Sequence, residues 1–280
     1  MLLVVISGLS GSGKSVALNV LEDADFYCVD NLPATLLSDT VEFLRAARHS
    51  SLAVTIDARS GASLAELPAV LAGLRERGID VRLVLLTARE DTLVRRFSET
   101  RRKHPLGDGT RTIEECIALE RGLMEPLADS GHSIDTSELS PHALRAWIKD
   151  LLVVRAGKLT LVFESFGFKD GIPLNADLVF DVRHLPNPFY DPKLRPLTGL
   201  DAPVAQFLAA QPDVQALLKD VGDYIERWLP AYIRDNRAYL IVALGCTGGR
   251  HRSVYLAEQL AGRFRPGVPV LVRHRHLNAA

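Results

Sequence analysis

The 280-residue sequence has few cysteines, almost no net charge and no long apolar run, and each shortage excludes a class of protein. Its three cysteines, Cys28, Cys116 and Cys246, fit no zinc pattern and favour a reduced, cytoplasmic setting. A formal net charge of -1 gives no overall attraction to nucleic acid or membrane, so such binding would need a local patch. No apolar run reaches bilayer length, and the first strand leads into a glycine-rich loop rather than a signal cleavage site. We expect a cytoplasmic protein that does not enter a membrane.

The composition is that of an ordinary soluble globular protein, with 47% hydrophobic and 24% charged residues. The length favours two domains of ordinary size over one large domain. We place the predicted boundary after residue 153, which gives domains at residues 1–153 and 154–280.

The most informative stretch lies at the start of the chain. Residues 2–6 are apolar and branched, as in a buried strand of a parallel sheet, and residues 8–15 fit the P-loop pattern of glycine, four residues and Gly-Lys-Ser. Lys14 is expected to reach the β- and γ-phosphates of a nucleoside triphosphate, and the Ser15 hydroxyl to ligate Mg²⁺. The alternative is a Gly/Ser-rich turn between a strand and a helix. The predicted nucleotide-binding residues are Gly8, Leu9, Ser10, Gly11, Ser12, Gly13, Lys14 and Ser15.

Two further strand ends in the first half carry polar side chains. Asp30 ends a predicted strand at residues 26–30, where a carboxylate can assist Mg²⁺ or a substrate, and it joins Lys14 and Ser15 as a candidate catalytic residue. Asp before a turn is also routine. Asp57, Ala58, Arg59 and Ser60 follow a predicted strand at residues 52–56, either as a polar cluster over the phosphates or as a plain strand-to-helix turn.

A basic run then follows a strand at residues 81–86. Arg95 and Arg96 are spaced to offer bidentate contacts to a transferred phosphate from a mobile lid, although nearby Glu90 and Glu99 also allow a salt-bridged, solvated helix. The alternation of strands and helices predicts an α/β fold: a P-loop NTPase or kinase-like, doubly wound parallel sheet.

The second half is predicted to be another α/β domain with a phosphate-binding loop. Strands are expected at residues 158–166, 177–182 and 238–244, and a helix at residues 254–264. Between the last strand and this helix, residues 245–253 form a glycine-rich loop, and a helix N-terminus after such a loop makes an anion nest. Positive side chains at Arg250, His251 and Arg252 favour a phosphate guest. The alternative is a structural turn with exposed basic residues.

The same loop must be compared with that of cysteine-dependent phosphatases. Cys246, five residues, Arg252 and Ser253 match that pattern, in which a thiolate attacks phosphorus. Here Gly245 stands in place of the usual histidine, and the two glycines lie closer to the cysteine. The differences favour a loop that binds phosphate without catalysis.

The C-terminal segment is basic. Arg273 and Arg275 alternate with histidines on a strand-like segment and, with Arg250, Arg252, Arg263 and Arg265, predict a basic face. Such a face can meet RNA phosphates, or it can be a solvated edge that discourages strand pairing.

Six motifs together resemble one bacterial family. They are Gly-Leu-Ser-Gly-Ser-Gly-Lys-Ser (8–15), Val-Asp-Asn-Leu-Pro (29–33), Asp-Ala-Arg-Ser (57–60), Phe-Gly-Phe-Lys (166–169), Leu-Pro-Asn-Pro (185–188) and Gly-Cys-Thr-Gly-Gly-x-His-Arg-Ser-Val (245–254). On these motifs, nearly end to end, the chain resembles the RapZ/YvcJ nucleotide-binding family. The resemblance implies ATP binding at Gly8–Ser15, GTP binding involving Asp57–Ser60, and weak ATPase and GTPase activity.

The resemblance also implies partners. Enteric members present a small regulatory RNA to an endoribonuclease, and their C-terminal domain senses glucosamine 6-phosphate and forms tetramers. This chain is accordingly expected to be a homo-oligomer. Enteric members end in a basic tail, whereas this chain ends Leu277-Asn278-Ala279-Ala280. The implied phosphosugar site consists of Lys169, Cys246, Thr247, Gly248, Gly249, Arg250, His251, Arg252 and Ser253.

The leading interpretation is a two-domain regulator that binds ATP or GTP, a phosphosugar and RNA. A small-molecule P-loop kinase is the first alternative, supported by Arg95 and Arg96. A phosphatase that uses Cys246 is the second.

Overall fold

The computed structural model describes residues 1–128, 130–153, 159–235, 237 and 239–277. The chain divides into two compact units, Met1–Ala156 and Gly157–Ala280. The boundary predicted after residue 153 lies beside residues 154–158, which are outside the described residues. Lys158 and Ala238, the first residues of two predicted strands, are outside them as well.

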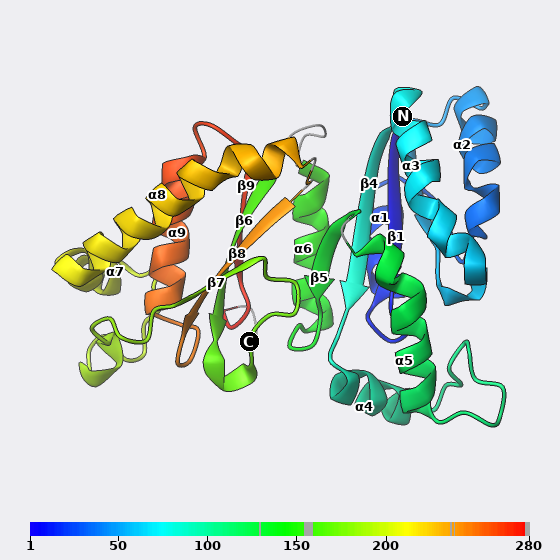
Figure 1. Ribbon diagram of the computed structural model, residues 1–280. Coiled ribbons are helices and arrows are strands. Elements are labelled where there is room, and N and C mark those ends of the chain that lie inside the picture. Colours follow the sequence, from blue (N-terminus) through cyan, green and yellow to red (C-terminus); the bar gives the residue numbers. More distant parts are fainter. Residues whose placement is uncertain (129, 154–158, 236, 238, 278–280) are drawn as a thin grey trace. The chain divides into compact units, whose positions relative to one another are not determined.

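The first unit is built on one parallel sheet whose described strands follow the order β2-β3-β1-β4-β5. The strands are β1 (Leu2–Gly8), β2 (Tyr27–Val29), β3 (Ser51–Thr55), β4 (Asp80–Thr87) and β5 (His132–Asp135). The helices are α1 (Lys14–Glu22), α2 (Leu37–Ala46), α3 (Leu67–Glu76), α4 (Glu90–Thr100), α5 (Ile113–Met124) and α6 (Pro141–Val153). Figure 1 shows α2 and α3 together beside this sheet.

Both faces of the first sheet are buried, which explains the unbroken apolar run at residues 2–6. Leu3 and Val5 on β1 belong to a core cluster with side chains of α2 and α3. Val4 and Ile6 alternate with them and are also buried, on the face where α1 packs with α6. The predicted α/β class with a doubly wound parallel sheet is confirmed.

The order of the strands places the P-loop. After β1 the chain crosses to β2 at one edge, and after β3 it crosses back to β4 on the other side of β1. The connection reverses direction around β1, and ligands of open α/β sheets bind at the carboxyl ends of strands at such a point.

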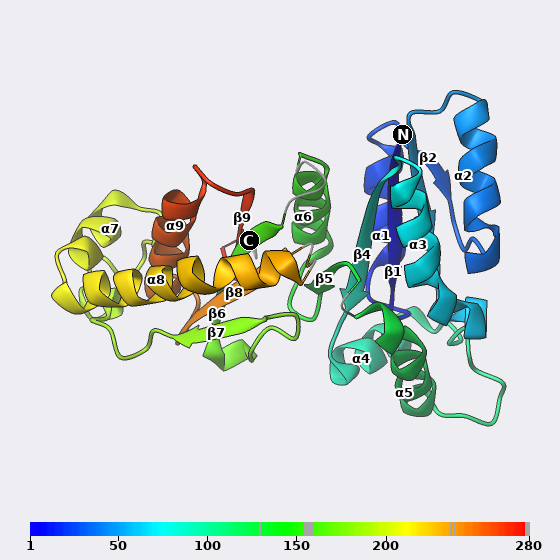
Figure 2. The ribbon, with the colours of Figure 1, turned by 45° about the horizontal axis from the view of Figure 1, so that its top comes forward.

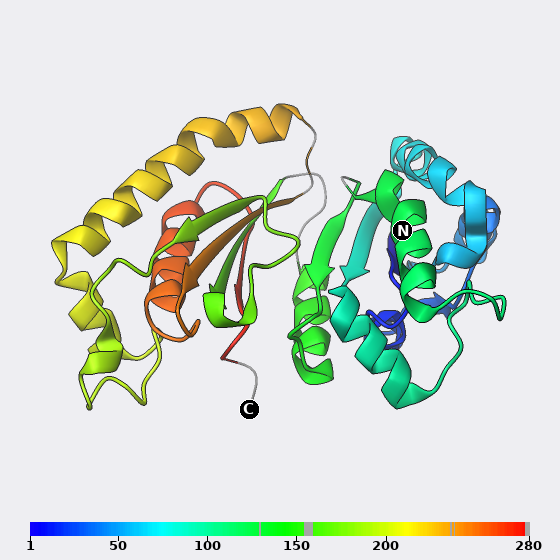
Figure 3. The ribbon, with the colours of Figure 1, turned by 60° about the horizontal axis from the view of Figure 1, so that its bottom comes forward.

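The second unit has its own parallel sheet, with described strands in the order β7-β8-β6-β9. Figure 2 shows β7 and β9 at its two edges. The strands are β6 (Thr160–Gly167), β7 (Leu178–Asp181), β8 (Tyr239–Cys246) and β9 (Val270–His274), and the helices are α7 (Ala202–Ala209), α8 (Pro212–Arg234) and α9 (Arg252–Phe264). Helix α9 packs on the strands and α8 packs on α9 (Figure 3). Within the described ranges, no helix combines the length and apolar character needed to cross a membrane.

A charged pair lies inside the second unit. Strand β6 is buried at every position, yet it carries Glu164, whose side chain is 1% exposed. Arg275, just after β9, places Nη1 3.3 Å from Oε1 of Glu164 and is itself 4% exposed at the side chain. A buried carboxylate requires such a cation, because an unpaired buried charge costs several kcal/mol (about 3–5).

Candidate nucleotide and phosphate sites

Glycine is required where β1 turns into the P-loop. Gly8 has a φ of 124° and Gly13 a φ of 107°, a region that other residues rarely adopt. A Cβ on Gly8 would also collide with the backbone carbonyl of Leu86 on β4. The shape of the loop therefore depends on the glycine backbone conformations, and the loop leads directly into α1 at Lys14.

Lys14 lies folded over its own loop. Its Nζ donates to the carbonyl oxygen of Gly8 at 2.7 Å. Burial lowers the pKa of Lys14, while the carboxylates of Glu120 and Asp57 act in the opposite direction. A phosphate that entered the loop would offer this ammonium group a stronger, charged acceptor.

Ser15 is exposed in the first turn of α1, directly after Lys14. Asp30 and Asp57 both act electrostatically on Lys14. A hydroxyl group and carboxylates are the oxygen ligands that Mg²⁺ uses, together with substrate phosphates. The donor set at this edge therefore fits the metal predicted from the sequence.

Asp57, directly after β3, is held by Arg59. The Arg59 side chain donates to both carboxylate oxygens, with Nη2 2.7 Å from Oδ2, and the Arg59 backbone N–H donates to Oδ1 at 3.0 Å. Burial raises the pKa of Asp57, but the hydrogen bonds and charge of Arg59, with the charge of Lys14, outweigh it and hold the pKa below its usual value. Asp57 is therefore an ionised, oriented carboxylate.

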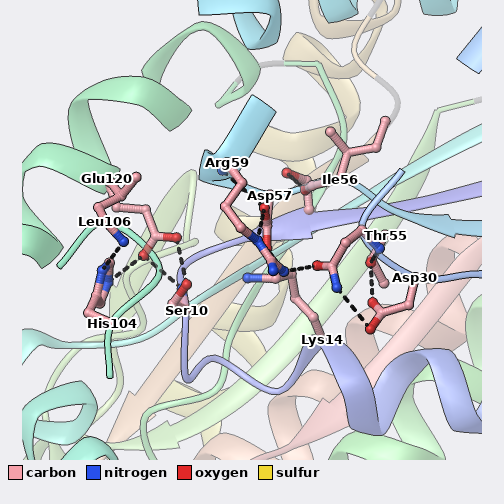
Figure 4. Close-up of polar contacts among 12 residues, drawn as sticks. Ser10, Lys14, Asp30, Thr55, Ile56, Asp57, Arg59, His104, Leu106 and Glu120 are labelled. Atoms are coloured by element: carbon pink, nitrogen blue, oxygen red, sulfur yellow. Dashed lines mark hydrogen bonds and ion pairs between the residues drawn. The ribbon is translucent and has the colours of Figure 1, made fainter. Parts of the chain in front are cut away.

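A chain of side chains joins Asp30 to Asp57, as Figure 4 shows. The Thr55 hydroxyl donates to Asp30 at 2.5 Å and accepts the Asn31 backbone N–H at 2.7 Å. Arg59 bonds the Asn31 side chain as well as Asp57. The ends of β2 and β3, predicted separately from the sequence, are thus brought together beside Lys14.

The other two residues of the 57–60 motif build the turn. Ala58 is buried, and the Ser60 backbone N–H donates to the Asp57 carbonyl at 3.0 Å. They position Asp57 and Arg59, whose side chains carry the charge of the motif.

Arg96 does not lie as the lid interpretation expects. Its guanidinium donates to the Gly11 carbonyl at 3.0 Å and to the Thr136 carbonyl at 2.6 Å, while Arg95 is exposed. Arg96 therefore ties the P-loop to the segment after β5. The predicted pair of arginines offered together to a phosphate is not the arrangement observed.

Sequence reasoning missed two residues that contact the P-loop, Thr136 and Glu120, and a third, His104, that contacts Glu120. The Thr136 hydroxyl donates to the Ser12 carbonyl at 3.0 Å. Glu120 is fully buried and accepts hydrogen bonds from Ser10, and His104 contacts Glu120. One available signal was that Glu120 continues the apolar stripe of α5, which is formed by Ile113, Cys116 and Ile117.

The loop after β8 is organised around Cys246. Its Sγ accepts the Gly249 backbone N–H at 3.2 Å and lies 3.2 Å from the Ser253 hydroxyl. Burial raises the pKa of Cys246, but the hydrogen bonds from Ser253 and Gly249 and the charge of Arg252 outweigh it, so that the thiol pKa is lowered. The loop therefore wraps its backbone around the sulfur.

Arg252 is a buried residue that forms hydrogen bonds beside this loop. It is 3% exposed, and its Nη1 donates to the carbonyls of Arg183 at 2.6 Å and Leu185 at 2.9 Å. Its Nη2 contacts the Thr247 hydroxyl at 3.4 Å, whereas its buried Nε has no hydrogen-bond partner among the described residues. Arg252 thus joins the loops that follow β7 and β8 and keeps one donor for a further acceptor.

The rim of the loop combines exposed and buried groups. Thr247 and Arg250 are exposed and Gly248 is half-buried, whereas Gly249, His251 and Ser253 are buried. The Lys169 backbone N–H donates to the Thr247 carbonyl at 3.3 Å, and the Lys169 side chain is exposed. The structure therefore brings Lys169 beside the loop, as the sequence resemblance implied.

Arg273 and Arg275 are not on the surface. They are 4% and 5% exposed, and Arg275 pairs with Glu164. Arg252 is buried too, and Arg263 pairs with Asp223 and Glu226. The predicted basic face is therefore not formed by these arginines, because three of them are buried and the fourth is neutralised by acids on α8.

The strand, glycine loop and helix at residues 2–22, with two acids at the neighbouring strand ends, define a P-loop protein of the α/β class. The chain belongs to the RapZ family: residues 1–156 match the RapZ-like N-terminal domain, and residues 159–278 match the RapZ C-terminal domain. The resemblance drawn from the sequence is confirmed.

Relatives of known sequence match this chain over nearly their whole length. The chain is 57% identical over 278 residues to a "Nucleotide-binding protein" of Thiobacillus denitrificans, covering 99% of this chain and 100% of that one. It is 56% identical over 278 residues to a protein of the same description from Methylobacillus flagellatus, covering 99% of each chain.

Solved structures match only in part. Shikimate kinase from Bacteroides thetaiotaomicron is 13% identical with a TM-score of 0.38, covering 55% of this chain and 99% of that one. A gluconokinase from Sinorhizobium meliloti is 16% identical with a TM-score of 0.35, covering 53% of this chain and 91% of that one.

Proposed function

We propose that this protein is a cytoplasmic regulator that binds ATP and GTP with Mg²⁺ in its N-terminal unit and hydrolyses them slowly. Its C-terminal unit binds a phosphorylated metabolite of the glucosamine 6-phosphate type. The observation that supports the first part is Lys14 on its P-loop, with Asp30 and Asp57 at adjacent strand ends acting on it.

Nucleotide binding follows from the contacts of the loop. Backbone N–H groups and the N-terminus of α1 attract the phosphates, and Lys14 exchanges the Gly8 carbonyl for a charged acceptor. Ser15 would hold Mg²⁺, which neutralises phosphate charge when bound. Asp30 is exposed and can orient a water molecule or the metal's hydration shell, and Asp57 with Arg59 and Ser60 would serve GTP.

Arg96 favours slow hydrolysis over rapid phosphoryl transfer. An arginine directed at the transferred phosphate accelerates such reactions by about 10³–10⁵. Arg96 instead bonds the carbonyls of Gly11 and Thr136. A small-molecule kinase would need that side chain to leave these acceptors, so the regulator is preferred.

In the C-terminal unit, the Cys246–Ser253 loop would bind a phosphate through its backbone N–H groups. Thr247, Arg250 and Lys169 are exposed, and their side chains would add contacts to that phosphate. A role in presenting RNA to an endoribonuclease, as a homo-oligomer, is part of the proposal on the family resemblance alone. The buried Arg273 and Arg275 do not add to it.

Cysteine-dependent phosphatase activity is the second candidate, favoured by the 3.2 Å contact between Cys246 Sγ and Ser253 Oγ and by the lowered thiol pKa. A thiolate nucleophile would give a stoichiometric burst of product from an aryl phosphate. We expect no burst, and we expect Cys246→Ser to keep phosphosugar binding. A burst that Cys246→Ser abolishes would establish the phosphatase instead.

Calorimetric titration tests the proposed function. ATP and GTP should each bind one site in the presence of Mg²⁺, and glucosamine 6-phosphate should bind a separate site whose affinity falls in Lys169→Ala. Nucleotide affinity should not change in that variant. Failure of both nucleotides to bind would refute the N-terminal assignment, and failure of the sugar phosphate to bind would refute the C-terminal one.

A further inference from the structure

A buried acid on α5 accepts two hydrogen bonds from the P-loop. Glu120 is 0% exposed, and its Oε2 accepts the Ser10 backbone N–H at 2.8 Å while its Oε1 accepts the Ser10 hydroxyl at 2.8 Å. Figure 4 shows this carboxylate on the opposite side of the loop from the group around Asp57. Both of its oxygens are therefore committed to one P-loop residue, 110 positions earlier in the chain.

His104 connects the same carboxylate to the segment between α4 and α5. His104 is 5% exposed and places Nε2 3.2 Å from Glu120 Oε2. The Leu106 backbone N–H donates to Nδ1 at 3.2 Å, which leaves Nε2 as the ring nitrogen that donates to Glu120. The ring also packs on Phe97, with centroids 5.1 Å apart.

Phe97 completes the contact with the loop. A Cβ on Gly11 would lie 3.5 Å from the Phe97 ring, so the ring supports the P-loop directly. Segment 101–111 is thus connected to the P-loop indirectly in two ways, through His104 and Glu120 and through the Phe97 ring on which His104 packs. Arg101, Arg102 and Lys103 in this segment are exposed and lie just before His104.

A carboxylate at position 120 opposes both folding and phosphate binding unless it has a compensating role. A buried carboxylate beside an anion-binding loop repels phosphate and carries a desolvation penalty, unless its hydrogen bonds compensate. Among the acids that raise the pKa of Lys14, Glu120 has the largest effect. The arrangement is understandable if the carboxylate fixes the loop in the shape that the phosphate needs.

We propose that Glu120 is a positioning residue for nucleotide binding, which holds Ser10 directly and holds segment 101–111 to the P-loop through His104. The inference rests on the proposed nucleotide site. It adds that loop shape and segment position are set together before the nucleotide arrives. Preorganisation of this kind raises affinity, because the loop loses less conformational freedom on binding.

The first experiment compares His104→Leu with His104→Gln, whose amide N–H₂ can replace the Nε2 donor. ATP affinity is measured by titration, and the rate of tryptic cleavage after Arg101, Arg102 and Lys103 is measured without nucleotide. His104→Leu should weaken ATP binding about tenfold and speed cleavage about tenfold, as loss of one hydrogen bond to a charged group allows. His104→Gln should stay within about threefold of the parent in both. His142→Leu, at an exposed histidine of the same unit, is the control.

Two further variants keep the proposal testable if a core substitution disturbs folding. Ser10→Ala removes the hydroxyl donor with little change of volume, and Glu120→Gln retains shape but turns an acceptor into a donor. Each should weaken ATP binding about tenfold with native circular dichroism. Unchanged ATP affinity or unchanged cleavage in His104→Leu would overturn the proposal. A parent protein that binds no ATP would refute the nucleotide site itself, while the cleavage rates would still test the tie to segment 101–111.

Discussion

The two anion loops are shaped by different parts of the chain. The P-loop has left-handed glycines at Gly8, Gly11 and Gly13, and its charge is on Lys14, a flexible side chain bonded to its own loop. The loop after β8 has one left-handed residue, Gly249, with a φ of 68°. Its conformation is fixed by buried side chains, Cys246 and Arg252.

In the first unit the charged residue that would bind the ligand is not the one that holds the loop in shape. In the second unit the same charged residue would do both. Lys14 can change partners without disturbing the backbone that surrounds it, whereas Arg252 holds two loops together and cannot be removed without loosening them. We expect substitutions of charge to affect ligand binding in the first unit and folding in the second. Four experiments test this contrast.

The largest effect is expected from Arg275→Leu, because the buried charges of the second unit are structural. Loss of Arg275 leaves Glu164 buried without the cation at 3.3 Å, at a cost of about 3–5 kcal/mol in the free energy of unfolding. Calorimetry should show this as a lower transition temperature for the second unit alone. Glu164→Leu with Arg275→Leu should recover most of the loss; a single variant as stable as the parent would contradict the idea.

Gly249→Ala should come next. Its φ is left-handed, and the new Cβ would lie 2.7 Å from the Gly167 backbone nitrogen, so strain and overpacking together should cost about 2–5 kcal/mol. Gly248→Ala is the matched control, since among the described residues no heavy atom beyond its two chain neighbours lies within 4 Å of its Cβ position, and it should stay within about 0.5 kcal/mol. Denaturant titrations compare the two, and equal stabilities would show that the loop backbone is not constrained.

Lys14→Ala should weaken ATP binding about 100-fold, or about 2.7 kcal/mol, while the protein keeps its transition temperature. The side chain makes one hydrogen bond to its own loop, so little stability depends on it. Lys149→Ala, at an exposed lysine of α6, controls for a general loss of positive charge. ATP bound as tightly as by the parent would remove Lys14 from the site.

The smallest effect concerns pH. The folded-state pKa of Cys246 is lowered from 9.0, so its thiolate adds stability that is fully present above pH 9 and is lost as the pH falls through the folded-state pKa. Each unit of lowering contributes about 1.4 kcal/mol. The stability of the parent relative to Cys246→Ser should therefore rise as the pH increases through the folded-state pKa towards pH 9. A constant difference would mean that the thiol stays protonated.

The sequence predicted those features that depend on neighbours along the chain. Residues 2–15 identify a strand, a loop and a helix because apolar periodicity and glycine spacing are local signals. Asp30 and Asp57 were found for the same reason, as acids directly after strands. Their connection through Thr55, Asn31 and Arg59 required the parallel pairing of β2 with β3, which no local pattern specifies.

The errors arose where a charged side chain found a distant partner. Arg96 was expected to meet a phosphate, but Gly11 and Thr136 accept its hydrogen bonds from far along the chain. Arg275 was expected at the surface, and its partner Glu164 lies in the middle of an apolar strand. Sequence patterns predict that a basic residue is exposed, because they do not show which distant acid it pairs with in the fold.

The position of β9 has a consequence for synthesis on the ribosome. The described strands of the first unit have all been made by Asp135, whereas the second sheet obtains β9, one of its two edge strands, and Arg275 only from residue 270 onwards. Elongation over the stretch between them takes roughly 7–30 s, long enough for the first unit to fold ahead of the second. A chain interrupted before β9 would thus carry a P-loop unit able to fold, joined to a second unit that lacks Arg275 and its ion pair with Glu164.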